Sequence, residues 1–127
     1  IHEWSFSLPD ALKNIHPSNY VGVDLDGTQA DYDTWKGLEH IGEPIPRMVA
    51  YVKFLLENNI KVVHFTARVA TNDQAKLNRA KEAIDAWSQR VYGQVLPVTA
   101  IKDKNMVLYY DDKACNVVLN EGTWQTH

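Results

Sequence analysis

The chain has little of what marks secreted, membrane or nucleic-acid-binding proteins. It contains a single cysteine, Cys115, so no internal disulfide can form, and this favours a reducing compartment. No apolar run approaches the roughly 20 residues of a membrane helix, and no signal-peptide pattern is visible. The formal net charge of -3 provides no basic field for nucleic acid, although a nucleic-acid end stays open as a substrate. We therefore expect a cytoplasmic protein without a membrane partner.

The composition is that of one ordinary globular domain. Hydrophobic residues make up 45% of the chain and charged residues 23%. A length of 127 residues suits a single domain that can bury a core without disulfide or metal cross-links. We take residues 1–127 as one domain, with an N-terminal arm or short helix at 1–19 and the core at about 20–120.

The hydrophobic pattern predicts strands that alternate with helices. Short β-rich runs predict five strands, at 20–26, 60–66, 96–102, 106–111 and 115–120. Apolar residues three and four apart predict helices at 46–59, where Pro46 suits the first turn, and at 73–92, closed by Gly93. This order implies right-handed crossovers. We therefore expect an α/β fold, with a Rossmann-like parallel sheet of about five strands between helices.

Polar side chains follow the first four predicted strands. Asp24 and Asp26 end the first strand and Thr66 ends the second, and after the third and fourth come Lys102 and the pair Asp111 and Asp112. Ligands of open α/β sheets bind outside the carboxyl ends of the strands, so these groups should meet. Four converging carboxylates repel one another unless a cation neutralises them. Oxygen ligands without clustered His or Cys favour a hard metal, by default Mg²⁺.

Four short motifs in this order resemble the haloacid dehalogenase (HAD) superfamily of phosphotransferases. They are "DLDGT" (24–28), "HFTAR" (64–68), "IKD" (101–103) and "YYDDKA" (109–114), and the resemblance covers roughly residues 20–120. In the third motif Lys102 is preferred to Lys104 because it lies closer to the strand end. The chain also looks like small HAD-like proteins of bacteria and phages that lack a cap domain.

The resemblance implies a Mg²⁺-dependent phosphomonoester hydrolase. Asp24 would attack phosphorus to form an aspartyl-phosphate, and Asp26 would act as general acid and then base. Thr66 and the next backbone N–H would hold phosphoryl oxygens, while Lys102 would offset the charge of Asp24 and the phosphate. The implied metal ligands are Asp24, Asp26, Asp111 and Asp112. The implied substrate-binding residues are Gly27, Thr28, Ala67, Arg68 and Trp35.

The predicted loops are too short for a cap domain. Only 18 residues separate Gly27 from Pro46, and only eight separate Lys102 from Asp111. The site should be open, or covered by a short flap or by a second subunit of a homo-oligomer. A phosphorylated small molecule, a nucleotide or a nucleic-acid end all remain candidate substrates. Tyr32 and Trp35 either pack the flap or cover the leaving group.

Other functions and roles stay open at this point. A HAD-fold protein that binds metal and phosphate without turnover would keep the same motifs. A receiver-like phosphoacceptor domain also uses acids, a Thr and a Lys, but the pair Asp24 and Asp26 on the first strand disfavours it. Arg68 either contacts substrate or is a surface arginine. We interpret His64 as a core or supporting residue and Cys115 as a small buried hydrophobe.

Overall fold

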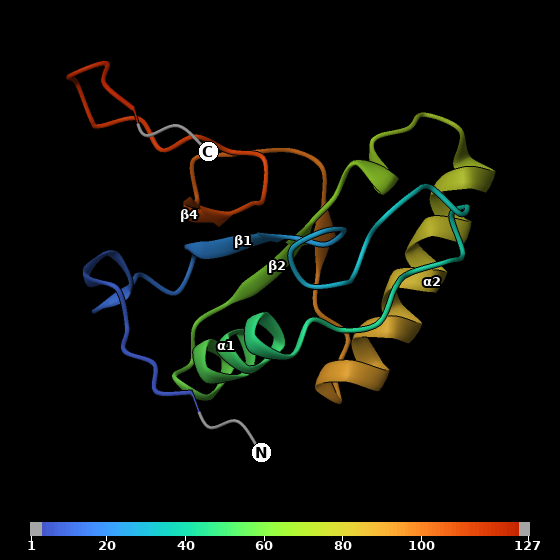
Figure 1. Cartoon of the computed structure of the whole chain (residues 1–127), viewed down its shortest axis with the longest axis horizontal. Coiled ribbons are helices and arrows are strands. Elements are labelled where there is room, and N and C mark those ends of the chain that lie inside the picture. The colour runs from blue at the N-terminus through green and yellow to red at the C-terminus, as the bar shows by residue number, and fades with distance from the viewer. Residues whose placement is uncertain (1–3, 125–127) are drawn as a thin grey trace.

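The computed structural model describes residues 4–124 and contains one four-stranded, all-parallel sheet (Figure 1). The strand order is β3-β2-β1-β4. The strands are β1 (Tyr20–Asp24), β2 (Val62–Phe65), β3 (Val98–Thr99) and β4 (Met106–Tyr110). The helices are α1 (Pro46–Glu57), α2 (Gln74–Tyr92) and the short 3₁₀ turns η1 (Asp10–Leu12) and η2 (Ala67–Val69). The α/β class predicted from the sequence is confirmed.

Local sequence signals explain where the helices begin and end. Pro46 occupies the first turn of α1, where its missing N–H costs nothing. The side chain of Asp73 caps α2 by accepting from the backbone N–H of Lys76. Gly93 ends α2 in the left-handed region, at φ 72°. Within the described residues, no helix has both the length and the apolar character to cross a bilayer.

Both α-helices pack against the same face of the sheet. Val23 of β1 shares a buried cluster with Val52 and Leu55 of α1. His64 of β2 is the register partner of Val23, and its ring contacts Trp87 of α2. The crossovers from β1 to β2 and from β2 to β3 run in one direction, so right-handedness places both helices on one side. The predicted placement of the sheet between helices is therefore wrong.

The predicted fifth strand at 115–120 does not form. An isolated bridge between Val117 and Trp124 is its only β-type pairing among the described residues. Leu119 is 84% exposed and Cys115 is exposed too, so the interpretation of Cys115 as buried is also wrong. A β-rich sequence becomes a strand only where a neighbouring strand and a core can use it. Beyond β4 this segment has neither, and the sheet stops at four strands.

The described part of the predicted N-terminal arm, residues 4–19, contributes to the hydrophobic core, and residues 1–3 lie outside the described residues. The turn η1 places Leu12 among the residues that pack between the sheet and α1, and Leu12 is only 1% exposed. Leu8 and Ile15 pack against the same cluster. The arm therefore closes the edge of the core.

We predict that Leu12→Ala lowers the free energy of unfolding by about 2–4 kcal/mol, because it leaves a cavity in this cluster. Leu119→Ala is the matched control, and its change should stay within about 0.5 kcal/mol because that side chain is exposed. Urea denaturation measures both values. Equal, small effects of the two substitutions would show that the arm does not belong to the core.

Candidate active site

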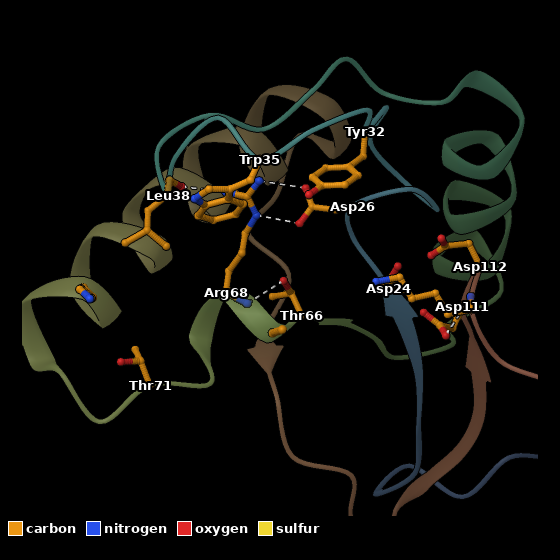
Figure 2. Close-up of a pocket in the computed structure, with 13 residues that line it drawn as sticks. Asp24, Asp26, Tyr32, Trp35, Leu38, Thr66, Arg68, Thr71, Asp111 and Asp112 are labelled. Carbon is orange, nitrogen blue, oxygen red and sulfur yellow. Dashed lines mark hydrogen bonds and ion pairs between the residues drawn. The ribbon is translucent and has the colours of Figure 1, made fainter.

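A pocket of about 470 Å³ lies beyond the carboxyl ends of the strands (Figure 2). This size suits a small organic ligand, and the position is where ligands of α/β sheets bind. Eight of the sequence-predicted site residues line it, namely Asp24, Asp26, Trp35, Thr66, Ala67, Arg68, Asp111 and Asp112. The convergence predicted from the strand ends is thus present, although the acids do not form one group.

Three of the four acids form a compact group. Asp24 ends β1, Asp111 and Asp112 follow the neighbouring β4, and one carboxylate oxygen from each lies within 4.8 Å of the others. The pKa of Asp24 is raised from 3.8 to about 7 by burial, by a hydrogen bond with Asp112 and by the negative charge of Asp111. Without a cation, the fold therefore favours a retained proton on Asp24 up to near-neutral pH.

Gly27 and Thr28 lie next to the acidic group and do not line the pocket. Gly27 has φ +88°, and a Cβ there would lie 2.9 Å from a carboxylate oxygen of Asp112. Only glycine therefore allows the chain to turn here so close to Asp112. The hydroxyl of Thr28 lies 3.2 Å from Asp24 Oδ2 and 3.3 Å from Asp112 Oδ1, and donates its one hydrogen between them.

The fourth acid, Asp26, is paired with Arg68. Nε and Nη2 of the guanidinium donate to the two carboxylate oxygens at 2.8 and 2.9 Å. The remaining N–H groups donate to the carbonyl oxygens of Gly37, Leu38 and His40. All five donors of this side chain, which is only 4% exposed, are thus engaged. Arg68 is neither a surface arginine nor free to bind phosphate, and it anchors the loop to Asp26.

The loop between β1 and α1 is fixed at both its tip and its base. Near the tip, the Trp35 ring lies over the guanidinium of Arg68, 4.8 Å from Cζ to the ring centroid. At the base, the indole N–H of Trp87 donates to the carbonyl of Gly42. A Cβ on Gly42 would lie 2.0 Å from the carbonyl oxygen of Asp31, so glycine is required there. This loop lines the pocket with Tyr32, Trp35 and Leu38, and these contacts hold it in place.

A buried polar chain supports the end of β1 from below. Tyr92 donates to Gln29 Oε1, and Gln29 Nε2 lies 3.2 Å from the Asp24 carbonyl oxygen and 3.1 Å from His64 Nδ1. The other ring nitrogen of His64 donates to Ser88. Burial lowers the pKa of His64 to about 4, so the ring is neutral at physiological pH. His64 is confirmed as a buried supporting residue, whereas nothing in the sequence singled out Gln29.

The lysines lie differently from the sequence-based expectation. Lys102 and Lys104 are both exposed, and neither lines the pocket. Lys76 and Lys113 do line it. The pKa of Asp112 is lowered overall. Burial alone would raise it, but the hydrogen bond with Asp24, further hydrogen bonds and the positive charge of Lys113 outweigh burial. Lys113 follows the acidic pair directly in the fourth motif, and that adjacency is the signal that could have identified it.

The donor set fits a hard divalent cation. Three carboxylates with no His or Cys ligand are what Mg²⁺ accepts, with water completing its shell. Scans against protein-family models, curated proteins and solved structures found no match to this chain. A functional assignment therefore rests on the chemistry of the site.

The raised pKa of Asp24 predicts a pH-dependent penalty on stability. The folded state keeps a proton that the unfolded state releases above pH 3.8, so the contribution of Asp24 to the free energy of unfolding falls as pH rises from about 4 to about 7. Asp24→Asn removes this contribution. Its stability relative to wild type should increase across that window and level off above it. Mg²⁺ at pH 8 should reduce the difference by stabilising the wild type.

Urea denaturation of the two proteins at several pH values, with and without Mg²⁺, measures this difference. Because the buried His64 is present in both proteins, its own titration cancels. A difference that stays constant from pH 4 to pH 8 would contradict the proximity of the three carboxylates.

We predict that Arg68→Ala lowers the free energy of unfolding by about 3 kcal/mol, because it leaves Asp26 and three carbonyl groups without their partner. Adding Asp26→Asn should recover part of this loss. Arg79→Ala is the matched control, since Arg79 of α2 pairs with Glu39 of the loop that Arg68 anchors, and an exposed ion pair of this kind contributes little to stability. Similar losses for Arg68→Ala and Arg79→Ala would contradict the anchoring role of Arg68.

Proposed function

We propose that this chain is a Mg²⁺-dependent phosphomonoester hydrolase of the HAD type, working through an aspartyl-phosphate on Asp24. The observation that carries the proposal is the group of Asp24, Asp111 and Asp112 within 4.8 Å at the carboxyl edge of a parallel sheet. Asp26 and Thr66 line the same pocket, in keeping with the motif order in the sequence.

Asp24, Asp111 and Asp112 would hold the metal. Bound there, Mg²⁺ would neutralise the carboxylates and attract the phosphoryl oxygens, so that the anionic substrate can approach. The carboxylate of Asp26 is engaged by Arg68 and lies outside this group, so its predicted share in metal binding is limited to its backbone. The separation leaves the Asp26 side chain to proton transfer.

The reaction would proceed in two steps. A carboxylate oxygen of Asp24 attacks phosphorus, the bond from phosphorus to the leaving oxygen breaks, and Asp26 gives that oxygen a proton. Water then attacks phosphorus, passes a proton to Asp26 and releases Asp24 and inorganic phosphate. Because both oxygens of Asp26 accept from Arg68 in the resting protein, protonation requires at least one of those hydrogen bonds to loosen.

Polar groups at the end of β2 would hold the transferring phosphoryl group. Thr66 Oγ1 accepts from the backbone N–H of Arg68, which leaves its hydroxyl hydrogen free to donate to a phosphoryl oxygen. Ala67, the next residue, also lines the pocket, and its backbone N–H would be a second donor to the phosphoryl group. Of the lysines, Lys113 is best placed to offset the charge, and Lys102→Ala serves as the comparison variant for Lys113→Ala.

Replacing the two carboxylates of "DLD" by Asn, one at a time, should change the hydrolysis of p-nitrophenyl phosphate with Mg²⁺ in different ways. Asp24→Asn should abolish turnover, because no nucleophile remains. Asp26→Asn should release one equivalent of nitrophenol in a burst and then stall, because nitrophenolate leaves without a proton while water still needs a base. Stopped-flow absorbance measures the burst and the steady rate.

Controls separate this function from the other candidates. Wild-type activity should disappear in excess chelator and return with Mg²⁺, and full activity without metal would overturn the mechanism. Mg²⁺ binding without any hydrolysis would favour a catalytically silent binding protein. A phosphoryl group accepted from acetyl phosphate and kept stably, with no hydrolysis of monoesters, would favour a receiver-like domain.

A further inference from the structure

We infer that the natural substrate is a nucleoside phosphate, whose base stacks on the face of Trp35 that is turned away from Arg68. The inference rests on the proposed phosphomonoester hydrolysis and adds the chemical class of the leaving group. It draws on the side of the pocket away from Asp24, Asp111 and Asp112, where Tyr32 and Trp35 lie beside the ion pair of Asp26 and Arg68.

Trp35 is a large aromatic residue left exposed and yet held in position. It is 53% exposed, although one of its faces is covered by Arg68. Trp87 of the core is only 1% exposed, so Trp35 differs from it in leaving a large part of its ring available to a ligand. The guanidinium beneath it is fixed by five hydrogen bonds, so the ring sits on a rigid support and loses little freedom when a ligand stacks on it.

The pocket separates the stacking surface from the reacting group. Figure 2 shows Asp24, Asp111 and Asp112 on one side, with Trp35 apart from them, beyond Asp26 and over Arg68. A ring bonded directly to the phosphate, as in phenyl phosphate, would remain beside Asp24. A sugar between phosphate and ring would span the interval, and the pocket volume of about 470 Å³ can hold a nucleotide.

The other lining residues suit a base and sugar. Tyr32 is 46% exposed and lines the pocket near Asp26, as a second aromatic surface. Thr71 and Lys76 contribute a hydroxyl and an ammonium that can hydrogen-bond to ring or sugar oxygens. A free nucleotide and the 5′-phosphate end of a nucleic acid present the same nucleoside phosphate, and the experiment separates these two sources.

The test compares adenosine 5′-monophosphate with ribose 5-phosphate, which differ only by the base, in wild type and in Trp35→Ala. We expect Trp35→Ala to lower kcat/KM for the nucleotide by roughly tenfold to a hundredfold, mainly through KM, because aromatic stacking contributes that much per base. The value for ribose 5-phosphate should hardly change. Trp35→Phe should keep most of the wild-type kcat/KM for the nucleotide. Trp124 is an exposed tryptophan outside the pocket, so Trp124→Ala should match wild type.

A 5′-phosphorylated oligonucleotide and phenyl phosphate complete the panel. If Trp35→Ala lowers kcat/KM for the oligonucleotide by a larger factor than for the mononucleotide, the inference is supported and a nucleic-acid end is the natural source of the nucleoside phosphate. Equal losses on nucleotide and ribose 5-phosphate, or a loss on phenyl phosphate as large as on the nucleotide, would overturn it. If no nucleoside phosphate is hydrolysed while p-nitrophenyl phosphate still is, the inference fails and the proposed hydrolysis stands.

Discussion

The charge of four acids at one edge of a sheet is the constraint on which this site depends. The fold divides them. Both oxygens of Asp26 are bonded to Arg68. Asp24, Asp111 and Asp112 each place a carboxylate oxygen within 4.8 Å of the others, and no lysine or arginine among residues 4–124 forms an ion pair with them. Buried like charges of this kind are costly, and in the absence of metal the cost appears as a proton held on Asp24. Under the proposed function, this division would separate the residues that hold the metal from the residue that transfers the proton.

The same ion pair fixes the wall of the pocket. Arg68 binds three carbonyl groups of the loop between β1 and α1 as well as Asp26, and it carries the Trp35 ring on its face. Beneath β1, the chain of hydrogen bonds from Tyr92 through Gln29 to His64 supports the backbone of Asp24. The backbone of Asp24 and the side chain of Asp26 are therefore held in place before any ligand arrives. Under the proposed function, such preorganisation would favour phosphoryl transfer, in which little of the barrier is covalent, while Asp26 would have to loosen a hydrogen bond to Arg68 to take up its proton.

Sequence reasoning found the elements that local signals define. The caps Asp73 and Gly93 mark α2, and the strand ends placed Asp24 and Asp111 at one edge. Sequence reasoning failed where tertiary contacts determine whether a segment forms a strand and on which face of the sheet a helix packs. The segment 115–120 has strand propensity but no neighbour, and the sheet carries both helices on one face because successive crossovers run in the same direction. The partners of Arg68 could not be predicted, because the loop carbonyls that it binds leave no pattern in side-chain identity.

The central claim is that Asp24 becomes covalently phosphorylated, and acid quenching followed by peptide mass spectrometry tests it most directly. Protein mixed with substrate and Mg²⁺ is stopped within the first turnover, digested and searched for an added phosphoryl group. The account predicts one phosphoryl group, on Asp24, labile to hydroxylamine and absent from Asp24→Asn. A phosphoryl group on Asp111, or hydrolysis that proceeds with no modified carboxylate at any quench time, would contradict it.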